Sequence, residues 1–219
     1  MKTVFFESKD DMEIIIPKDL IKVLPKKIIM FTTVQHVDQI ESMKNQLEDI
    51  EVKTIKLSHT KHPGQILGCS IRKIEENCDA FLYIGDGEFH PKALVLKNDK
   101  PVYSYNPYSK DFKSFEDADN LKKRQKAGLV KFHSSKEIGV LITLKPGQNR
   151  MKKAKELKEL YPDKNFYFLM ADTFDFGSLE DFNFLECFVN TACPRIGYDD
   201  NIKIFKPVVN IEELNNQEW

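Results

Sequence analysis

The chain has 219 residues and a formal net charge of −1, from 33 basic and 34 acidic side chains. This near balance argues against a dedicated nucleic-acid binder, because neutralising phosphates needs a clustered excess of positive charge. Hydrophobic residues make up 41% of the sequence and include 16 Phe, which excludes a globally disordered chain and provides for a packed core.

The N-terminal sequence MKTVFFESKDDMEIIIP soon turns acidic and has no small-residue cleavage site of the kind found in secretory signal peptides. No apolar run approaches the ~20 residues that a membrane-spanning helix needs. We therefore expect a cytoplasmic protein without membrane association. In such a protein the four cysteines are expected to be core thiols, catalytic thiols or metal ligands rather than a disulfide framework.

The first half of the sequence predicts alternating strands and helices. Two short apolar runs within residues 1–16 favour an edge strand or a hairpin. Apolar residues spaced three to four apart predict an amphipathic helix over 37–50. The strand–helix–strand order implies parallel strands joined by right-handed crossovers. The other predicted strands are 26–36, 51–57, 79–87 and 100–106, and the other predicted helices are 17–24, 70–77 and 89–97.

The second half begins with a charged helix over 115–132, after which the same pattern restarts. Its predicted elements are a strand at 136–148, a helix at 149–162, strands at 164–172 and 184–195, and a closing segment at 203–214. This repeat predicts an α/β fold of two related three-layer units with mainly parallel sheets. The predicted domains are 1–114 and 136–219, joined by a connecting helix at 115–135.

The segment GDGEFH follows the predicted strand 79–87, at the end of a strand where ligands bind in open α/β sheets. Gly85 and Gly87 allow close approach to the backbone, and Asp86 and His90 supply polar groups. The alternative is that Gly-Asp-Gly is simply a turn. It is not a dinucleotide fingerprint, because that pattern requires glycine where His90 stands.

Two of the four cysteines lie at strand or loop ends. Cys69 follows a Pro-Gly turn in HPGQILGCS, and Cys193 lies in TACPR, where an apolar strand breaks at a proline. A free cysteine can equally be a small buried hydrophobe, and this interpretation is preferred for Cys78 and Cys187. No CxxC or local His/Cys spacing occurs, so a metal would need ligands from distant parts of the chain or from another chain.

Six segments together resemble the diphthamide synthases, the 2-(3-amino-3-carboxypropyl)histidine synthases of archaea and eukaryotes. They are TTVQHVDQI, HPGQILGCS, DAFLYIGDGEFHPKAL, PVYSYNPYSK, VNTACPRIGYDD and FKPVV. Each is short, but all six occur in the order of the family and cover nearly the whole chain. The resemblance is therefore specific.

The resemblance implies a non-standard radical S-adenosylmethionine enzyme. In the family, three cysteines, one from each of three related domains, hold a [4Fe–4S] cluster with an open iron. The reaction transfers a 3-amino-3-carboxypropyl group from S-adenosylmethionine to a histidine of translation elongation factor 2. Cys69 matches the second-domain ligand and Cys193 the third-domain ligand. The residues that match the S-adenosylmethionine pocket are Gln65, Gly85, Asp86, Gly87 and His90.

The sequence departs from the family at its start, which resembles the second domain. The first domain and its cluster cysteine are therefore expected to be absent, which leaves the cluster under-ligated. A separate polypeptide could supply the missing domain, two copies could share a cluster, or the chain could have lost catalysis. We favour a subunit in a homo- or hetero-oligomer with a family partner. The alternative is a non-catalytic module that docks a full-length synthase or elongation factor 2.

Overall fold

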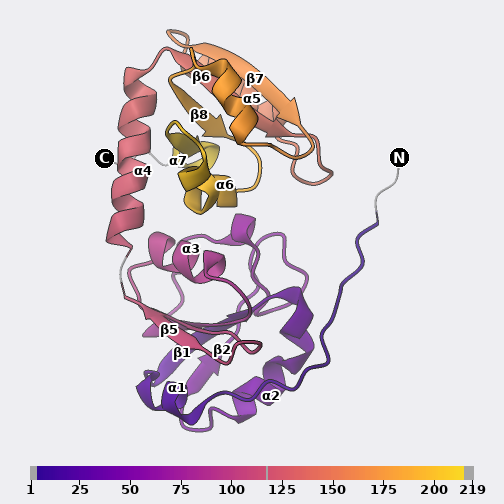
Figure 1. Ribbon diagram of the computed structural model, residues 1–219. Helices are drawn as coiled ribbons and strands as arrows, with labels where there is room; N and C mark the ends of the chain where they lie inside the picture. The colour runs from indigo at the N-terminus through magenta and orange to yellow at the C-terminus, as the bar shows by residue number, and fades with distance from the viewer. Residues whose placement is uncertain (1–3, 117, 215–219) are drawn as a thin grey trace. The chain divides into compact units, whose positions relative to one another are not determined.

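The computed structural model describes residues 4–116 and 118–214. The chain forms two compact units, divided between Ala118 and Asp119, and each is built around its own sheet (Figure 1). Both sheets are mostly parallel, which confirms the predicted α/β class. The three-part division predicted from the sequence, with a separate connecting helix, stays a prediction.

The first unit contains a five-stranded sheet in the order β2-β1-β3-β4-β5. The first four strands are parallel, and β5 pairs antiparallel with β4. Its strands are β1 (Lys27–Thr32), β2 (Glu51–Lys53), β3 (Ala80–Ile84), β4 (Val102–Tyr105) and β5 (Phe112–Phe115), and its helices are α1 (Lys18–Val23), α2 (Ile40–Asn45) and α3 (Phe89–Lys97). Strand β5 is short and exposed and has no apolar run, so the sequence did not predict it.

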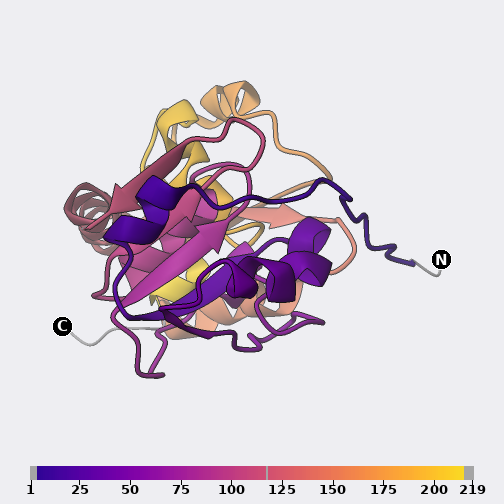
Figure 2. The ribbon, with the colours of Figure 1, turned by 90° about the horizontal axis from the view of Figure 1, so that it is seen from below.

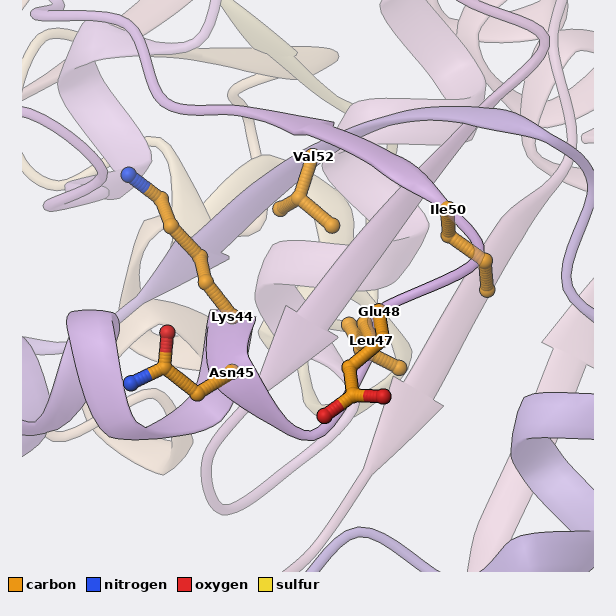
Figure 3. Close-up of a pocket in the computed structure, with 6 residues that line it drawn as sticks. All are labelled: Lys44, Asn45, Leu47, Glu48, Ile50 and Val52. Atoms are coloured by element: carbon orange, nitrogen blue, oxygen red, sulfur yellow. The ribbon is translucent and has the colours of Figure 1, made fainter.

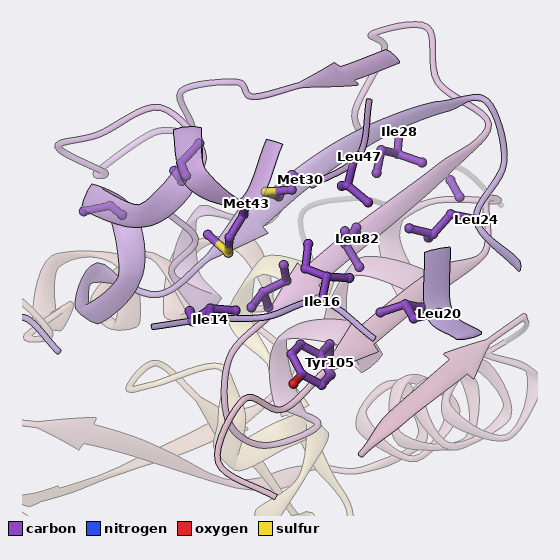
Figure 4. Close-up of a cluster of buried hydrophobic side chains, with 14 residues drawn as sticks. Ile14, Ile16, Leu20, Leu24, Ile28, Met30, Met43, Leu47, Leu82 and Tyr105 are labelled. Carbon is purple, nitrogen blue, oxygen red and sulfur yellow. The ribbon is translucent and has the colours of Figure 1, made fainter. Parts of the chain in front are cut away.

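The two central strands β1 and β3 are buried on both faces, as near-continuous apolar runs in parallel sheets usually are. Alternate side chains point to opposite faces. Met30 and Leu82, which are register partners, pack on one face against Met43 and Leu47 (Figure 4). Helix α3 packs against β3 and β4, so the sheet lies between helical layers.

The N-terminal segment differs from its prediction. Residues 4–16 form neither strand nor hairpin and run as extended chain to α1 (Figures 1 and 2). Hydrogen bonds of this backbone run to glutamine side chains, and not to a neighbouring strand. Gln46 accepts a hydrogen bond from the Ile16 N–H at 2.8 Å and donates one to the Ile14 carbonyl at 2.8 Å. The apolar side chains of Ile14 and Ile16 are buried all the same.

Two predicted helices also differ. The amphipathic segment 37–50 divides into a 3-10 helix, η1 (Val34–Gln39), and the short α2. The predicted helix at 70–77 is wrong, since the only helical turn there is the 3-10 helix η2 (Gly68–Ser70). The buried Asn98 side chain accepts a hydrogen bond from the Ile74 N–H at 2.8 Å, which holds this stretch in a non-helical path.

The second unit has four parallel strands in the order β7-β6-β8-β9. This order repeats that of β2-β1-β3-β4, which confirms the predicted relation between the units. The strands are β6 (Glu137–Thr143), β7 (Asn165–Ala171), β8 (Cys187–Asn190) and β9 (Val208–Asn210). The α-helices are α4 (Asp119–Ser134), α5 (Met151–Leu160), α6 (Arg195–Tyr198) and α7 (Ile211–Leu214), and the 3-10 helices are η3 (Gly177–Phe182) and η4 (Asp200–Lys203).

The charged helix α4 packs against the second sheet. Phe132 is fully buried in a cluster with Ile138 and Leu157. A Cβ atom at Gly128 would lie 3.3 Å from the Val208 carbonyl oxygen, so the helix approaches β9 closely. On the other face, a cluster that includes Phe188 packs under η3 and α6. Among the described helices of the chain, none has the length and apolarity needed to cross a membrane.

Candidate functional site

The strand order of the first unit reverses between β1 and β3, since β1 leads to β2 on one side and β3 leads to β4 on the other. Ligands in open α/β sheets bind outside the carboxyl ends of the strands at such a switch point. Here the buried Thr32 hydroxyl donates a 2.6 Å hydrogen bond to the Ile84 carbonyl. This bond ties the ends of the two strands together.

The loop that carries Cys69 begins beside the end of β1. Thr32 N–H donates to the Gly64 carbonyl at 2.8 Å, and Ile66 N–H donates to the Thr32 carbonyl at 2.9 Å. The buried Gln65 side chain accepts hydrogen bonds from the backbone N–H groups of Lys61 at 2.8 Å and of the next residue at 3.1 Å. Gln65 therefore lies at the switch point, and its carbonyl oxygen holds the loop.

A buried serine closes the turn around Cys69. The Ser70 hydroxyl accepts from Leu67 N–H at 3.1 Å and donates to the Leu67 carbonyl at 2.7 Å. Ser70 is 2% exposed, whereas Cys69 between these residues is exposed. The turn therefore presents Cys69 to solvent, while the buried Ser70 hydroxyl holds the backbone of the turn.

The GDGEFH segment is organised by Tyr83, a fully buried residue on β3. Its hydroxyl donates to the Asp86 carbonyl at 2.9 Å, so the Nδ1 of His90, 3.2 Å away, is the donor to the Tyr83 oxygen. Burial raises the pKa of Tyr83, which keeps this hydroxyl protonated. A Cβ atom at Gly85 would lie 2.7 Å from the same oxygen. The sequence indicated Tyr83 only as part of an apolar run.

Asp86 is exposed and belongs to a small hydrogen-bonded group. Its Oδ1 accepts from Gly87 N–H at 2.8 Å and from the Asn106 side-chain amide at 2.8 Å. Gly87 has a φ of +73°, a backbone conformation that glycine adopts without strain. Asn106 follows β4, so the group joins the ends of two neighbouring strands.

The structure brings the Cys69 turn and the GDGEFH segment together. Helix η2 packs against α3. A Cβ atom at Gly68 would lie 2.3 Å from the ring of Phe89, so only a glycine allows this approach. All the residues predicted from the sequence in the first unit therefore gather at the carboxyl edge of its sheet.

The N-terminal segment crosses near this edge. The Glu7 carboxylate lies 3.0 Å from His62 Nε2, 3.2 Å from Lys61 Nζ and 3.3 Å from Lys9 Nζ. The hydrogen bond from His62, followed by that from Lys61, lowers the pKa of Glu7 from 4.5 to about 2. Glu7 thereby anchors the segment to the loop that carries Cys69.

The second unit has its own switch point, between β6 and β8. The Thr191 hydroxyl, just after β8, donates to the Leu141 carbonyl at 2.8 Å. Asn190 closes the turn that leads to Cys193, because it accepts from Ala192 N–H at 3.0 Å and donates to the Cys193 carbonyl at 2.9 Å. Cys193 is partly exposed on this turn. The sequence prediction missed Asn190, although an Asn at a strand end is typical of such turns.

The other two cysteines are core residues, as predicted. Cys78 is 4% exposed and Cys187 is fully buried. Burial raises the pKa of the Cys78 thiol, and it raises the pKa of Cys187 to about 11. Within residues 4–116 and 118–214, no group of three or more His, Cys, Asp or Glu side chains is placed to hold a metal ion.

Open surface pockets lie at the opposite, amino-terminal edges of the sheets. One of about 410 Å³ adjoins the start of β2 and is lined by Lys44, Asn45, Leu47, Glu48, Ile50 and Val52 (Figure 3). A second of about 510 Å³ adjoins the start of β7 and includes Lys164 and Asn165. Since ligands of such sheets bind at the carboxyl ends, neither pocket belongs to the candidate site.

The chain is similar to known proteins over most of its length. The family model described as "Putative diphthamide synthesis protein" matches residues 1–217. The chain is 34% identical over 199 residues to a 2-(3-amino-3-carboxypropyl)histidine synthase of Pyrococcus horikoshii, and the match covers 89% of this chain and 58% of that protein. It is 28% identical to subunit 1 of the corresponding synthase of Debaryomyces hansenii, with 88% of this chain and 49% of that protein covered.

The fold is similar to that of solved relatives. Dph2 from Pyrococcus horikoshii superposes with a TM-score of 0.78 at 32% identity, covering 90% of this chain and 58% of that one. A structure of the same protein with a 4Fe-4S cluster has a TM-score of 0.78 at 31% identity, covering 92% and 61%. The chain thus spans about half to three fifths of the length of these relatives. With nearly all of its residues matched by the family model, the chain belongs to the diphthamide synthesis protein family.

Proposed function

We propose that this chain takes part in diphthamide synthesis and that Cys69 and Cys193 each supply a thiolate to a [4Fe–4S] cluster. The observation that carries this proposal is the contrast among the four cysteines. Two are buried and have raised pKa values, whereas Cys69 and Cys193 are accessible on closed turns at the switch points of the sheets. Accessible thiols on loops fit a cluster, which thiolates hold. A cluster also occurs in the solved relative.

The proposed reaction transfers a 3-amino-3-carboxypropyl group from S-adenosylmethionine to a histidine of elongation factor 2. The cluster would supply the electron that cleaves S-adenosylmethionine, and the protein would bind and orient the reactants. Gly85 and Gly87 would let the substrate approach the backbone, while Asp86 and His90 would present polar groups to it. Gln65 would act by holding the loop on which Cys69 lies.

Two thiolates are fewer than such a cluster needs, since three or four cysteines hold it in related sites. Cys78 and Cys187 are buried in the cores of their units and are unsuited to the role. We therefore propose that a further ligand comes from a partner polypeptide of the same family. Cluster formation, and with it the transferase activity, would then depend on an oligomer.

Anaerobic reconstitution with iron and sulfide, in the presence of a candidate family partner, tests the proposal. We expect an absorption band at roughly 400 nm, typical of thiolate-ligated clusters. Cys69→Ala and Cys193→Ala should each lose the band and the iron, whereas the matched core variants Cys78→Ala and Cys187→Ala should keep both. If all four variants retain iron equally, the assignment of the ligands is wrong. Binding of elongation factor 2 without any cluster would instead favour a non-catalytic docking module.

A further inference from the structure

Two asparagines lie side by side beneath the Cys193 turn. Asn190 ends β8, Asn210 ends β9, and the two are register partners in the second sheet. They are 1% and 0% exposed, and the Asn190 amide donates a 2.7 Å hydrogen bond to the Asn210 side-chain carbonyl. A buried amide costs free energy unless its polar groups are satisfied. The hydrogen-bonding partners of the two amides therefore indicate the role of the pair.

Three further hydrogen bonds of the pair run to consecutive backbone residues. Asn190 accepts from the Ala192 N–H at 3.0 Å and donates to the Cys193 carbonyl at 2.9 Å. Asn210 donates to the Pro194 carbonyl at 3.1 Å. The backbone is thus held just before Cys193, at Cys193 and just after it, by side chains that solvent does not reach.

Further contacts fix Asn210 in place. Glu213, which is 8% exposed, accepts from the Asn210 amide at 3.4 Å and from the Gln125 amide on α4 at 2.7 Å. A Cβ atom at Gly197 would lie 2.5 Å from the Asn210 side chain, so α6 packs directly on it. The support for the Cys193 turn therefore extends from β9 to α4, α6 and α7.

We propose that Asn190 and Asn210 are positioning residues that hold the backbone of Cys193 so that its thiol is set for cluster binding. This inference rests on the proposed function, in which Cys193 is a ligand. A ligand is effective when its own backbone and rotamer are locked by buried hydrogen bonds. The pair acts through Cys193 and not on the substrate or the cluster directly.

The four cysteines provide a direct test in the metal-free chain. Iodoacetamide modifies each thiol at a rate that peptide mass spectrometry can follow separately. In Asn190→Ala the hydrogen bonds that close the turn are lost, and we expect the Cys193 rate to rise on the order of tenfold. Cys187 is buried in the same unit, so its modification rate reports unfolding of that unit. Because the unit should stay folded, we expect this rate to stay within about twofold of the wild-type rate. Asn183→Ala, at an exposed position of that unit, is the matched control.

Asn190→Ser gives a graded comparison, because a hydroxyl can close a local turn but does not reach Asn210. We expect a Cys193 rate between those of wild type and Asn190→Ala. If Asn190→Ala does not fold, Asn190→Ser and Asn210→Ser provide the same comparison. After reconstitution with a family partner, the variants should release iron to a chelator several-fold faster than wild type, as expected for the loss of one or two hydrogen bonds.

An unchanged Cys193 rate in these variants would overturn the inference, and so would a parallel rise at Cys187, which would show a merely structural role. Failure of the proposed function looks different. If Cys193→Ala keeps its iron, Cys193 is not a ligand whatever the alkylation rates show. A positive result needs both a selective rise at Cys193 and faster iron release.

Discussion

Replacement of Gly68 by alanine should separate the Cys69 turn from the GDGEFH segment. The added methyl group would lie 2.3 Å from the nearest carbon of the Phe89 ring, whereas ordinary contacts begin at 3.4 Å. The ring or the turn must therefore move by about 1 Å, and overpacking of this kind costs about 1–3 kcal/mol. Since Phe89 is the first residue of α3 and precedes His90, the movement should disturb both parts of the site.

Urea denaturation of the wild type, Gly68→Ala, Phe89→Leu and the double variant measures this coupling. We expect Gly68→Ala to lower the free energy of unfolding by about 1–3 kcal/mol and Phe89→Leu to relieve part of that loss in the double variant. The Cys69 alkylation rate should change in Gly68→Ala, while that of Cys193 should not. If Gly68→Ala is as stable as wild type, or if the two substitutions are additive, the close packing of the turn on α3 is not as described.

Two further predictions concern the loop that carries Cys69. Gln65→Ala should lower the free energy of unfolding by roughly 1–3 kcal/mol in urea denaturation, because two backbone N–H groups lose their acceptor; Gln65→Glu, which keeps an acceptor oxygen, should lose less. The pKa of Glu7 is about 2 in the folded chain and 4.5 ordinarily, so its stabilising contribution is present above pH 4.5 and is lost as the pH falls toward 2. Urea midpoints measured from about pH 6 to about pH 2 should therefore fall less steeply in Glu7→Gln than in wild type. Equal slopes would contradict the anchoring role of Glu7.

The sequence predicted where the candidate site residues lie better than it predicted the hydrogen-bonding partners that hold them. Cys69 was expected at a loop end because it follows a Pro-Gly turn, and Cys193 because an apolar strand breaks at a proline beside it. Both are accessible there. The side chains that hold them were not predicted. Ser70 and Asn190 are ordinary polar residues in the sequence, and Tyr83 reads as part of an apolar strand. Each acquires its role only when a backbone group comes within hydrogen-bonding distance.

What the sequence by itself determined is the α/β class, the repeat of two units and the central strands, because these depend on local apolar runs and their spacing. Only the tertiary structure decided the path of residues 4–16, the break in the helix at 37–50 and the non-helical course of 70–77. For residues 4–16 and 70–77, a side chain distant in sequence takes backbone hydrogen bonds. Gln46 reaches Ile14 across 32 positions, and Asn98 reaches Ile74 across 24. Local periodicity contains no information about such partners.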